Sequence, residues 1–141
     1  MQDLTFGESG EYYYYPAIRA DGGGNLIAVF NRSSTGEYVG VYASGQPASA
    51  PNTFQMPVPV KAGEAPYTIS PPRWGDYSGA SLDPSSSTMV WIAGEYSQVT
   101  RVATSGRPGS YRRISDTSSA GPAVLTILKK ADHVRSSRPG S

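Results

Sequence analysis

The segment RWGDY at positions 73–77 carries the side chains best suited to hold a polar ligand. The rings of Trp74 and Tyr77 offer flat faces that can stack on sugar rings, and Arg73 and Asp76 offer directional hydrogen bonds. The same segment has a second interpretation, in which the tryptophan is buried between sheets and the aspartate stabilises a turn. An internal repeat of the chain favours this second, structural role.

Paired carboxylates are the enzymatic option that the sequence leaves open. Hydrolysis of a glycosidic bond needs an acid and a base or nucleophile about 5–10 Å apart. The available carboxylates are Glu11, Glu64, Asp76 and Glu95. Nothing in their spacing requires this chemistry, so we expect no catalytic residue in this chain alone.

Cofactor and metal chemistry find little support in the sequence. The single histidine, His133, excludes His-based triads and sites with several histidine ligands. The glycine-rich stretch DGGGN at 21–25 is not followed by the Lys-Ser/Thr of a phosphate-binding loop. We therefore expect neither a cofactor nor a metal.

The composition predicts an all-β protein. The chain has 141 residues, which indicates one domain, and it contains 16 Gly, 12 Pro and 10 Tyr with no helical apolar periodicity. Such a composition is typical of short strands joined by tight turns. The absence of cysteine excludes a disulfide framework. Neither a membrane-spanning apolar run nor a signal peptide is visible in this chain.

Charge divides the chain into two regions. Residues 1–106 hold five Lys and Arg against nine Asp and Glu, a balance of −4. Residues 107–141 hold seven basic residues against two acidic ones, a balance of +5. We expect 107–141 to be a basic, poorly ordered tail in which 123–134 could form a short helix. Its scattered charges and single aromatic residue argue against nucleic-acid binding, and no membrane partner is expected.

The chain contains a repeat that appears when it is shifted on itself by about 62 residues. The segment EYYYYPAIRAD at 11–21 then aligns with RWGDYSGASLD at 73–83, which places Tyr12 on Trp74 and Asp21 on Asp83. In each copy an aspartate opens a turn, because its carboxylate can accept hydrogen bonds from N–H groups two or three residues later. The strands expected after these turns are 26–30 and 38–44 in the first copy, and 89–94 and 99–105 in the second.

The repeat also bears on the run of four tyrosines at 12–15. A position that is aromatic in both copies is better explained by shared architecture than by a ligand, so the run is first of all the entry to a strand. Successive side chains of a strand point to opposite faces. We therefore expect Tyr13 and Tyr15 to lie on the opposite face from Tyr12 and Tyr14.

Three antiparallel strands in each unit of about 60 residues are typical of a β-propeller blade, and a solenoid and a sandwich are the alternative architectures. Ser81, Asp83, Thr88 and Trp91 follow the order of the Asp-box pattern S-x-D-x-G-x-T-W, although the glycine is absent and the turn is longer. With the flanking RWGDYSG and EY, these residues make 8–106 resemble consecutive blades of bacterial Asp-box (BNR-repeat), sialidase-like β-propellers. The resemblance implies that Ser81, Asp83 and the matching Asp21 stabilise hairpin turns, and that Trp91 packs between neighbouring sheets.

The expected fold is all-β, with two antiparallel propeller-type blades at about 8–46 and 67–106, a proline-rich connection at 47–66 and the tail at 107–141. Two blades cannot close a ring, so we expect a fragment of a larger propeller whose remaining blades, or self-association, cover the open faces. A sialidase-like enzyme would also need an arginine clamp, for which Arg19, Arg32 and Arg73 are available.

The function that the resemblance implies is a non-catalytic structural or carbohydrate-binding portion of an exported, extracellular or cell-surface propeller. One alternative is a fragment of a sialidase-like glycoside hydrolase whose active site needs missing blades. A second alternative is a protein-interaction module. Under the binding hypothesis, the candidate ligand-binding residues are Arg73, Trp74, Asp76, Tyr77 and Glu95, and the ligand is a glycan or a protein.

Overall fold

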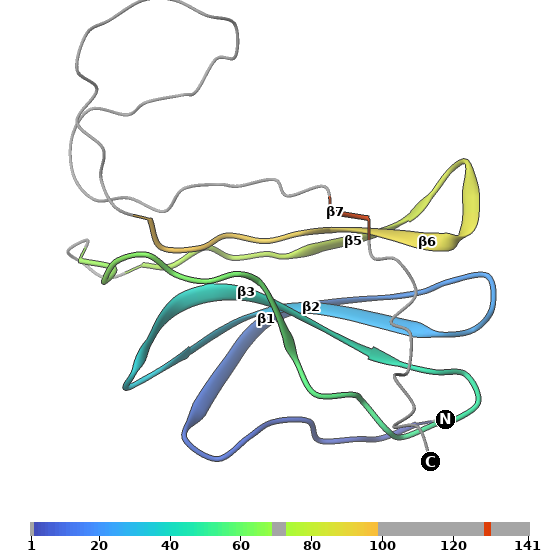
Figure 1. Cartoon of the computed structure of the whole chain (residues 1–141), viewed down its shortest axis with the longest axis horizontal. Coiled ribbons are helices and arrows are strands. Elements are labelled where there is room, and N and C mark those ends of the chain that lie inside the picture. The colour runs from blue at the N-terminus through green and yellow to red at the C-terminus, as the bar shows by residue number, and fades with distance from the viewer. Residues whose placement is uncertain (1, 69–72, 99–128, 131–141) are drawn as a thin grey trace, which may run out of the picture.

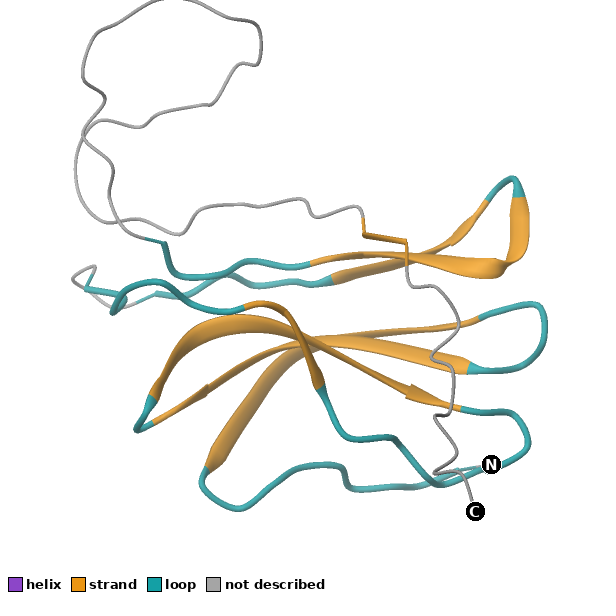
Figure 2. Cartoon of the chain, viewed as in Figure 1, coloured by secondary structure: helices purple, strands orange, loops and turns teal. Residues whose placement is uncertain are grey.

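The computed structural model contains two antiparallel β-sheets that lie one over the other (Figure 1). It describes residues 2–68, 73–98 and 129–130. All regular structure in these residues is β, which confirms the all-β expectation (Figure 2). No helix that could cross a membrane occurs among them.

The first sheet is a four-stranded meander. Its strands, in spatial order, are β1 (Glu11–Ala20), β2 (Leu26–Ser34), β3 (Glu37–Gln46) and β4 (Val58–Lys61). The strands expected at 26–30 and 38–44 fall inside β2 and β3. Strand β4 lies at the sheet edge within the proline-rich connection, where Pro59 is tolerated because an edge strand needs fewer backbone N–H donors.

The second sheet consists of β5 (Gly79–Asp83), β6 (Ser86–Ala93) and β7 (Lys129–Lys130). Strand β6 includes most of the strand expected at 89–94. Lys129 and Lys130 pair with Ile92 and Trp91, so these two tail residues are in a strand rather than in the helix considered for 123–134. The rest of the tail and the strand expected at 99–105 lie outside the described residues.

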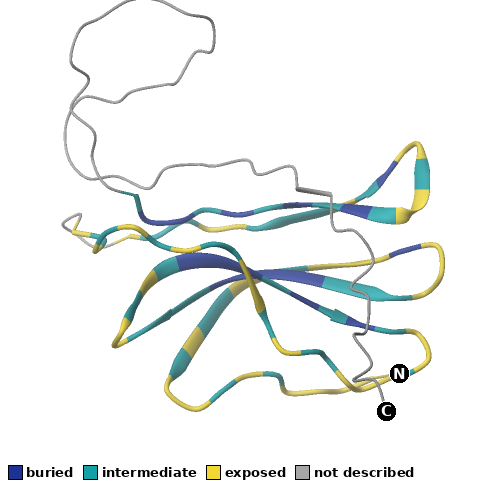
Figure 3. Cartoon of the chain, viewed as in Figure 1, coloured by how far each residue is buried: buried dark blue, intermediate teal, exposed yellow. Residues whose placement is uncertain are grey.

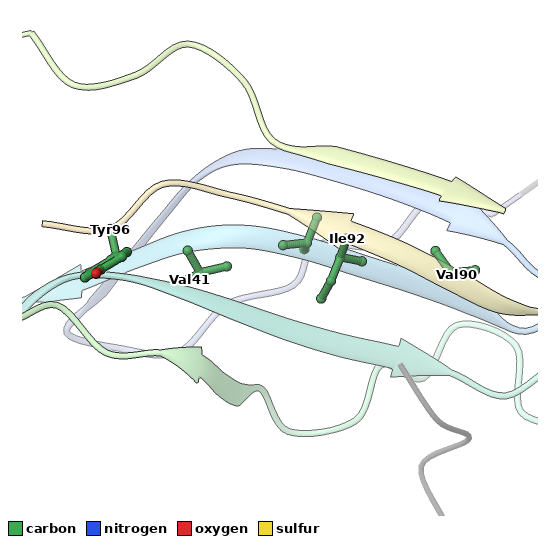
Figure 4. Close-up of a cluster of buried hydrophobic side chains, with 5 residues drawn as sticks. Val41, Val90, Ile92 and Tyr96 are labelled. Carbon is green, nitrogen blue, oxygen red and sulfur yellow. The ribbon is translucent and has the colours of Figure 1, made fainter. Parts of the chain in front are cut away.

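The main core lies between the two sheets. Val29 and Val41 of the first sheet pack against Val90 and Ile92 of β6 and against Tyr96, which follows β6 (Figure 4). These side chains are almost completely buried, and the buried stretches of β2, β3 and β6 lie where the two layers meet (Figure 3). Removing this apolar surface from water is what holds the two sheets together.

A second apolar cluster covers the opposite face of the first sheet. Phe30 and Tyr42 are buried there, and Phe6, Tyr13 and Phe54 pack on them. The rings of Tyr13 and Phe30 meet edge to face with centroids 5.0 Å apart, a favoured aromatic geometry. The N-terminal segment and the β3–β4 connection thus close this outer face.

The two aspartates that the repeat aligns both open hairpins. Asp21 Oδ1 accepts hydrogen bonds from the N–H groups of Gly23 and Asn25, at 2.8 and 2.9 Å. Asp83 Oδ1 accepts one from the Ser85 N–H at 2.7 Å. The hairpins also touch each other, because the Gly22 N–H donates to the Ser87 carbonyl at 2.5 Å.

The sheets meet through opposite faces of the aligned strands. The shift of about 62 residues places Val29 on Trp91, and it places Ala28 and Phe30 on Val90 and Ile92. Val29 faces the common core from β2, whereas Val90 and Ile92 face it from β6. The two sheets therefore pack with one face of the first against the opposite face of the second, as like units do in a stack. Because side chains alternate along a strand, Trp91 lies on the outer face of the second sheet.

Candidate functional site

Asn31 of β2 connects the first sheet to the segment after β6 and to the segment 73–78 that precedes β5. Its side chain is only 2% exposed. Nδ2 donates to the carbonyls of Gly40 and Glu95, at 3.0 and 2.6 Å. Oδ1 accepts a hydrogen bond from the Trp74 indole N–H at 3.2 Å. Both amide hydrogens and the oxygen are thus used, and Trp74 is held at a fixed place beside the sheets.

Aromatic side chains gather around this anchor. We use the name aromatic cluster for Tyr14, Tyr15, Tyr67 and Trp74. The Trp74 and Tyr67 rings are perpendicular with centroids 4.9 Å apart, and the Tyr14 and Tyr15 rings are perpendicular at 5.6 Å. The Tyr15 hydroxyl donates to the Trp74 carbonyl at 3.3 Å, which joins the two pairs. Tyr67 donates to the Arg73 carbonyl.

The charged residues expected at this site lie beside the aromatic cluster. Arg73 Nη2 and Asp76 Oδ2 form an ion pair at 2.6 Å with both side chains well exposed. Tyr77 is 85% exposed, so its ring is available for contact with a ligand. The structure therefore presents Tyr77 and this ion pair to solvent, within three residues in sequence of Trp74, which is partly buried.

Glu95 reaches this group from the segment after β6. A Cβ atom at position 75 would clash with Glu95 Oε2, so the carboxylate lies against the main chain where residue 75 has no side chain. Oε2 is buried and has no hydrogen-bond partner among the described residues. Burial, and secondly the negative charge of Asp76, raise the pKa of Glu95 above its ordinary value.

Among the carboxylates considered for catalysis, only Asp76 and Glu95 come together. Glu64 pairs with Lys61 at 2.6 Å. Glu11 lies 3.5 Å from the guanidinium of Arg32, on the other face of the first sheet. The structure thus brings one acidic pair to the aromatic cluster.

The three arginines considered for a clamp do not converge. The Arg32 guanidinium lies 3.9 Å from the ring centroid of Tyr42, on the outer face of the first sheet. Glu8, Glu11 and Glu37 surround it at 3.0–3.5 Å. Arg19 pairs with Ile27 near the far end of β1 and is exposed. Only Arg73 belongs to the site.

The residues expected to shape turns occupy different settings. The Trp91 indole N–H donates to Asp83 Oδ2 at 3.0 Å, so Trp91 supports the β5–β6 turn from the outer face of the sheet. The Ser81 side chain is exposed, and its hydroxyl lies 3.4 Å from the Leu82 carbonyl rather than on the turn. Asp21 accepts a further hydrogen bond from the side chain of Asn25 at 2.8 Å.

The expectation that Tyr15 lies on the opposite face from Tyr14 was wrong. The register of β1 shifts between Tyr14 and Ala17, and Tyr15 has a φ of 52°. Such a bulge interrupts the alternation of side chains, and Pro16, which has no N–H, suits an irregularity of this kind. The Tyr15 ring therefore meets that of Tyr14.

Asn31 was not among the site residues predicted from the sequence, although the pattern of side chains along β2 points to it. Asn31 follows Ile27 and Val29 at a spacing of two, on the face of β2 that is buried. A polar side chain in such a row must find hydrogen-bond partners, because leaving it unpaired is costly. Its partners could not be named, since Trp74 and Glu95 are 43 and 64 residues away.

No group of three or more metal-ligating side chains occurs in the part of the chain that the structure describes. No protein-family model, curated protein or solved structure matches this chain. The resemblance to Asp-box propellers therefore rests on the motif residues alone.

Proposed function

We propose that this chain is a non-catalytic, carbohydrate-binding portion of a sialidase-like β-propeller, and that the ligand binds beside the aromatic cluster. The observation that carries the proposal is the fixed position of Trp74, whose indole is bonded to the buried Asn31. The same short segment, 73–77, also carries the exposed ring of Tyr77 and the Arg73–Asp76 pair. Aromatic faces next to a few directional polar groups are what recognition of a sugar ring requires.

The propeller part of the proposal is supported by the two aligned hairpins. Asp21 and Asp83 both bind backbone N–H groups at the start of a turn, and the sheets pack through opposite faces. Further units of the same kind would continue this packing on the outer face of the second sheet, where Trp91 lies. An extracellular or cell-surface location follows from the family resemblance only.

The test is a comparison of glycan binding by the whole chain and by Tyr77→Ala. The Tyr77 ring is exposed, so its removal leaves the fold intact. We expect the affinity to fall about tenfold, which corresponds to about 1.4 kcal/mol for one aromatic contact. Tyr38→Ala is the matched control, since Tyr38 is 50% exposed and lies on β3, outside the segment 73–77.

The carbohydrate hypothesis fails under either of two results. One is the absence of binding across a broad glycan array. The other is an equal loss of affinity in the Tyr77 and Tyr38 variants, because binding would then not involve the proposed surface. Binding of a protein instead of a glycan would favour the interaction-module alternative.

A second candidate, a fragment of a glycoside hydrolase, is favoured by the acidic pair. Asp76 is paired with the guanidinium of Arg73, whereas burial, and secondly the charge of Asp76, raise the pKa of Glu95. Two carboxylates in such different environments suit the base and acid roles of glycoside hydrolysis. In this candidate Glu95 would protonate the leaving-group oxygen.

Turnover of fluorogenic glycosides separates the two candidates. A hydrolase predicts activity that Glu95→Gln abolishes while glycan binding persists, because the amide keeps the shape of the acid but cannot transfer its proton. The binding module predicts binding without turnover. Activity that survives Glu95→Gln unchanged would remove Glu95 from the acid role.

A further inference from the structure

The charges around the aromatic cluster limit which sugars it can hold. Arg73 is the one cation placed at the cluster by the described residues, and Asp76 occupies it at 2.6 Å. Glu95 adds a second carboxyl group, close enough to Asp76 for their charges to interact. The three side chains together carry a charge of −1 when Glu95 is ionised and zero when it is protonated. While the Arg73–Asp76 ion pair persists, they present no net positive charge to a ligand.

The other nearby cations of the described residues are already used. The guanidinium of Arg32 is surrounded by carboxylates on the opposite face of the sheet. Lys61 pairs with Glu64, and its ammonium lies 4.7 Å from the ring centroid of Tyr96. An acidic sugar at the cluster would thus meet two carboxyl groups and one cation, Arg73, whose charge is already offset by Asp76.

An uncharged sugar meets no such obstacle. One face of its ring can stack on an exposed aromatic side chain, and its hydroxyl groups can donate to the carboxylate of Asp76. Arg73 retains further N–H groups that can donate to ring and hydroxyl oxygens while its bond to Asp76 persists. An aromatic ring, Asp76 and Arg73 can therefore all contact a neutral sugar without breaking the Arg73–Asp76 ion pair.

We propose that the site selects neutral oligosaccharides over carboxylate-bearing ones, because Asp76 neutralises Arg73 and Glu95 repels a second negative charge. This inference rests on the proposed carbohydrate-binding function. It makes Asp76 the residue that determines specificity: freeing Arg73 from it would turn a site for neutral sugars into one that accepts acidic sugars. It also departs from the ligand class that the name sialidase-like suggests.

The experiment compares matched sugars by titration calorimetry on the whole chain. One pair is N-acetyllactosamine and its sialylated form, and the other is an oligogalactose and the corresponding oligogalacturonate. We expect the neutral member of at least one pair to bind at least tenfold more tightly than the acidic member. Because repulsion between charges is screened by salt, this difference should shrink as the ionic strength rises.

Asp76→Asn provides the specific variant. It removes one negative charge and releases Arg73, so the ratio of the affinity for the acidic member to the affinity for the neutral member should rise at least tenfold. Asp76 is exposed, which makes a folding defect unexpected. Glu64→Gln is the matched control, because it releases Lys61 from an ion pair of the same length and spacing elsewhere and changes the net charge equally.

The outcomes separate this inference from the function on which it rests. Equal or tighter binding of the acidic sugars by the unmodified chain overturns the selectivity and leaves carbohydrate binding in place. An equal gain in Asp76→Asn and Glu64→Gln overturns the role of Asp76, because net charge alone would then explain the effect. The absence of binding to all four sugars by both the unmodified chain and Asp76→Asn, together with the absence of binding across the glycan array, overturns both proposals.

Discussion

Replacing Asn31 with leucine tests the anchor of the site most severely. Leucine has nearly the same shape but no polar atoms, so the carbonyls of Gly40 and Glu95 and the indole N–H of Trp74 each lose a hydrogen bond. A hydrogen bond contributes about 1 kcal/mol net, and a buried group left unpaired costs about 1–3 kcal/mol. Second lone pairs on the carbonyls and the apolar burial of leucine offset part of this loss. We therefore expect the free energy of unfolding to fall by about 2–4 kcal/mol.

Denaturant unfolding and thermal melting measure this change. For a chain of this size, about 1 kcal/mol lowers Tm by about 4 °C, so we expect a drop of about 8–16 °C. Ser33→Ala is the control on the same strand, since it removes a single hydrogen bond from the Tyr14 hydroxyl and should cost about 1 kcal/mol or less. If Asn31→Leu and Ser33→Ala were equally stable, Asn31 would not be the link that we describe.

Two further predictions concern, first, the contact between the two hairpins and, second, the ionisation of Glu95. Gly22→Ala should destabilise the chain by about 1–3 kcal/mol in denaturant unfolding, because the added Cβ would lie 2.8 Å from the Ser87 carbonyl; Gly36→Ala, where no atom lies within 4 Å, should have little effect. Burial, and secondly Asp76, raise the pKa of Glu95 above its ordinary value of 4.5, so the folded protein holds this proton more tightly than the unfolded chain. The resulting cost is absent below pH 4.5 and sets in as the pH rises through the folded pKa, so Glu95→Gln should raise Tm at neutral pH and leave it unchanged below pH 4.5. A Tm difference that is the same at both pH values would contradict the burial of this carboxylate.

Much of the β-structure could be predicted because its signals are local. Asp21 and Asp83 act on N–H groups two to four residues later, so the turn chemistry is contained within a few consecutive residues. The strands that follow these turns could be predicted because their signals are also local. The short edge strand β4 lies within the proline-rich connection expected at 47–66, and its position could not be predicted because its pairing with β3 depends on residues distant in sequence.

The site was predicted only in part. The segment 73–77 was identified by residue type, and Glu95 was included without any evidence that it lies nearby. The contact between Glu95 and Gly75 depends on how the segment after β6 passes the loop before β5, which no local pattern specifies. The bulge at Tyr15 likewise depends on pairing with β2, so a simple alternation placed this ring on the wrong face.

The most direct test of the binding proposal uses the two tryptophans of the chain as reporters. Their indole N–H groups give separate NMR signals, one from Trp74 beside Asn31 and one from Trp91 beside Asp83. Titration of the isotope-labelled chain with a neutral oligosaccharide should shift the Trp74 signal and leave that of Trp91 in place. A shift confined to Trp91, or saturating binding that moves neither signal, would contradict the account.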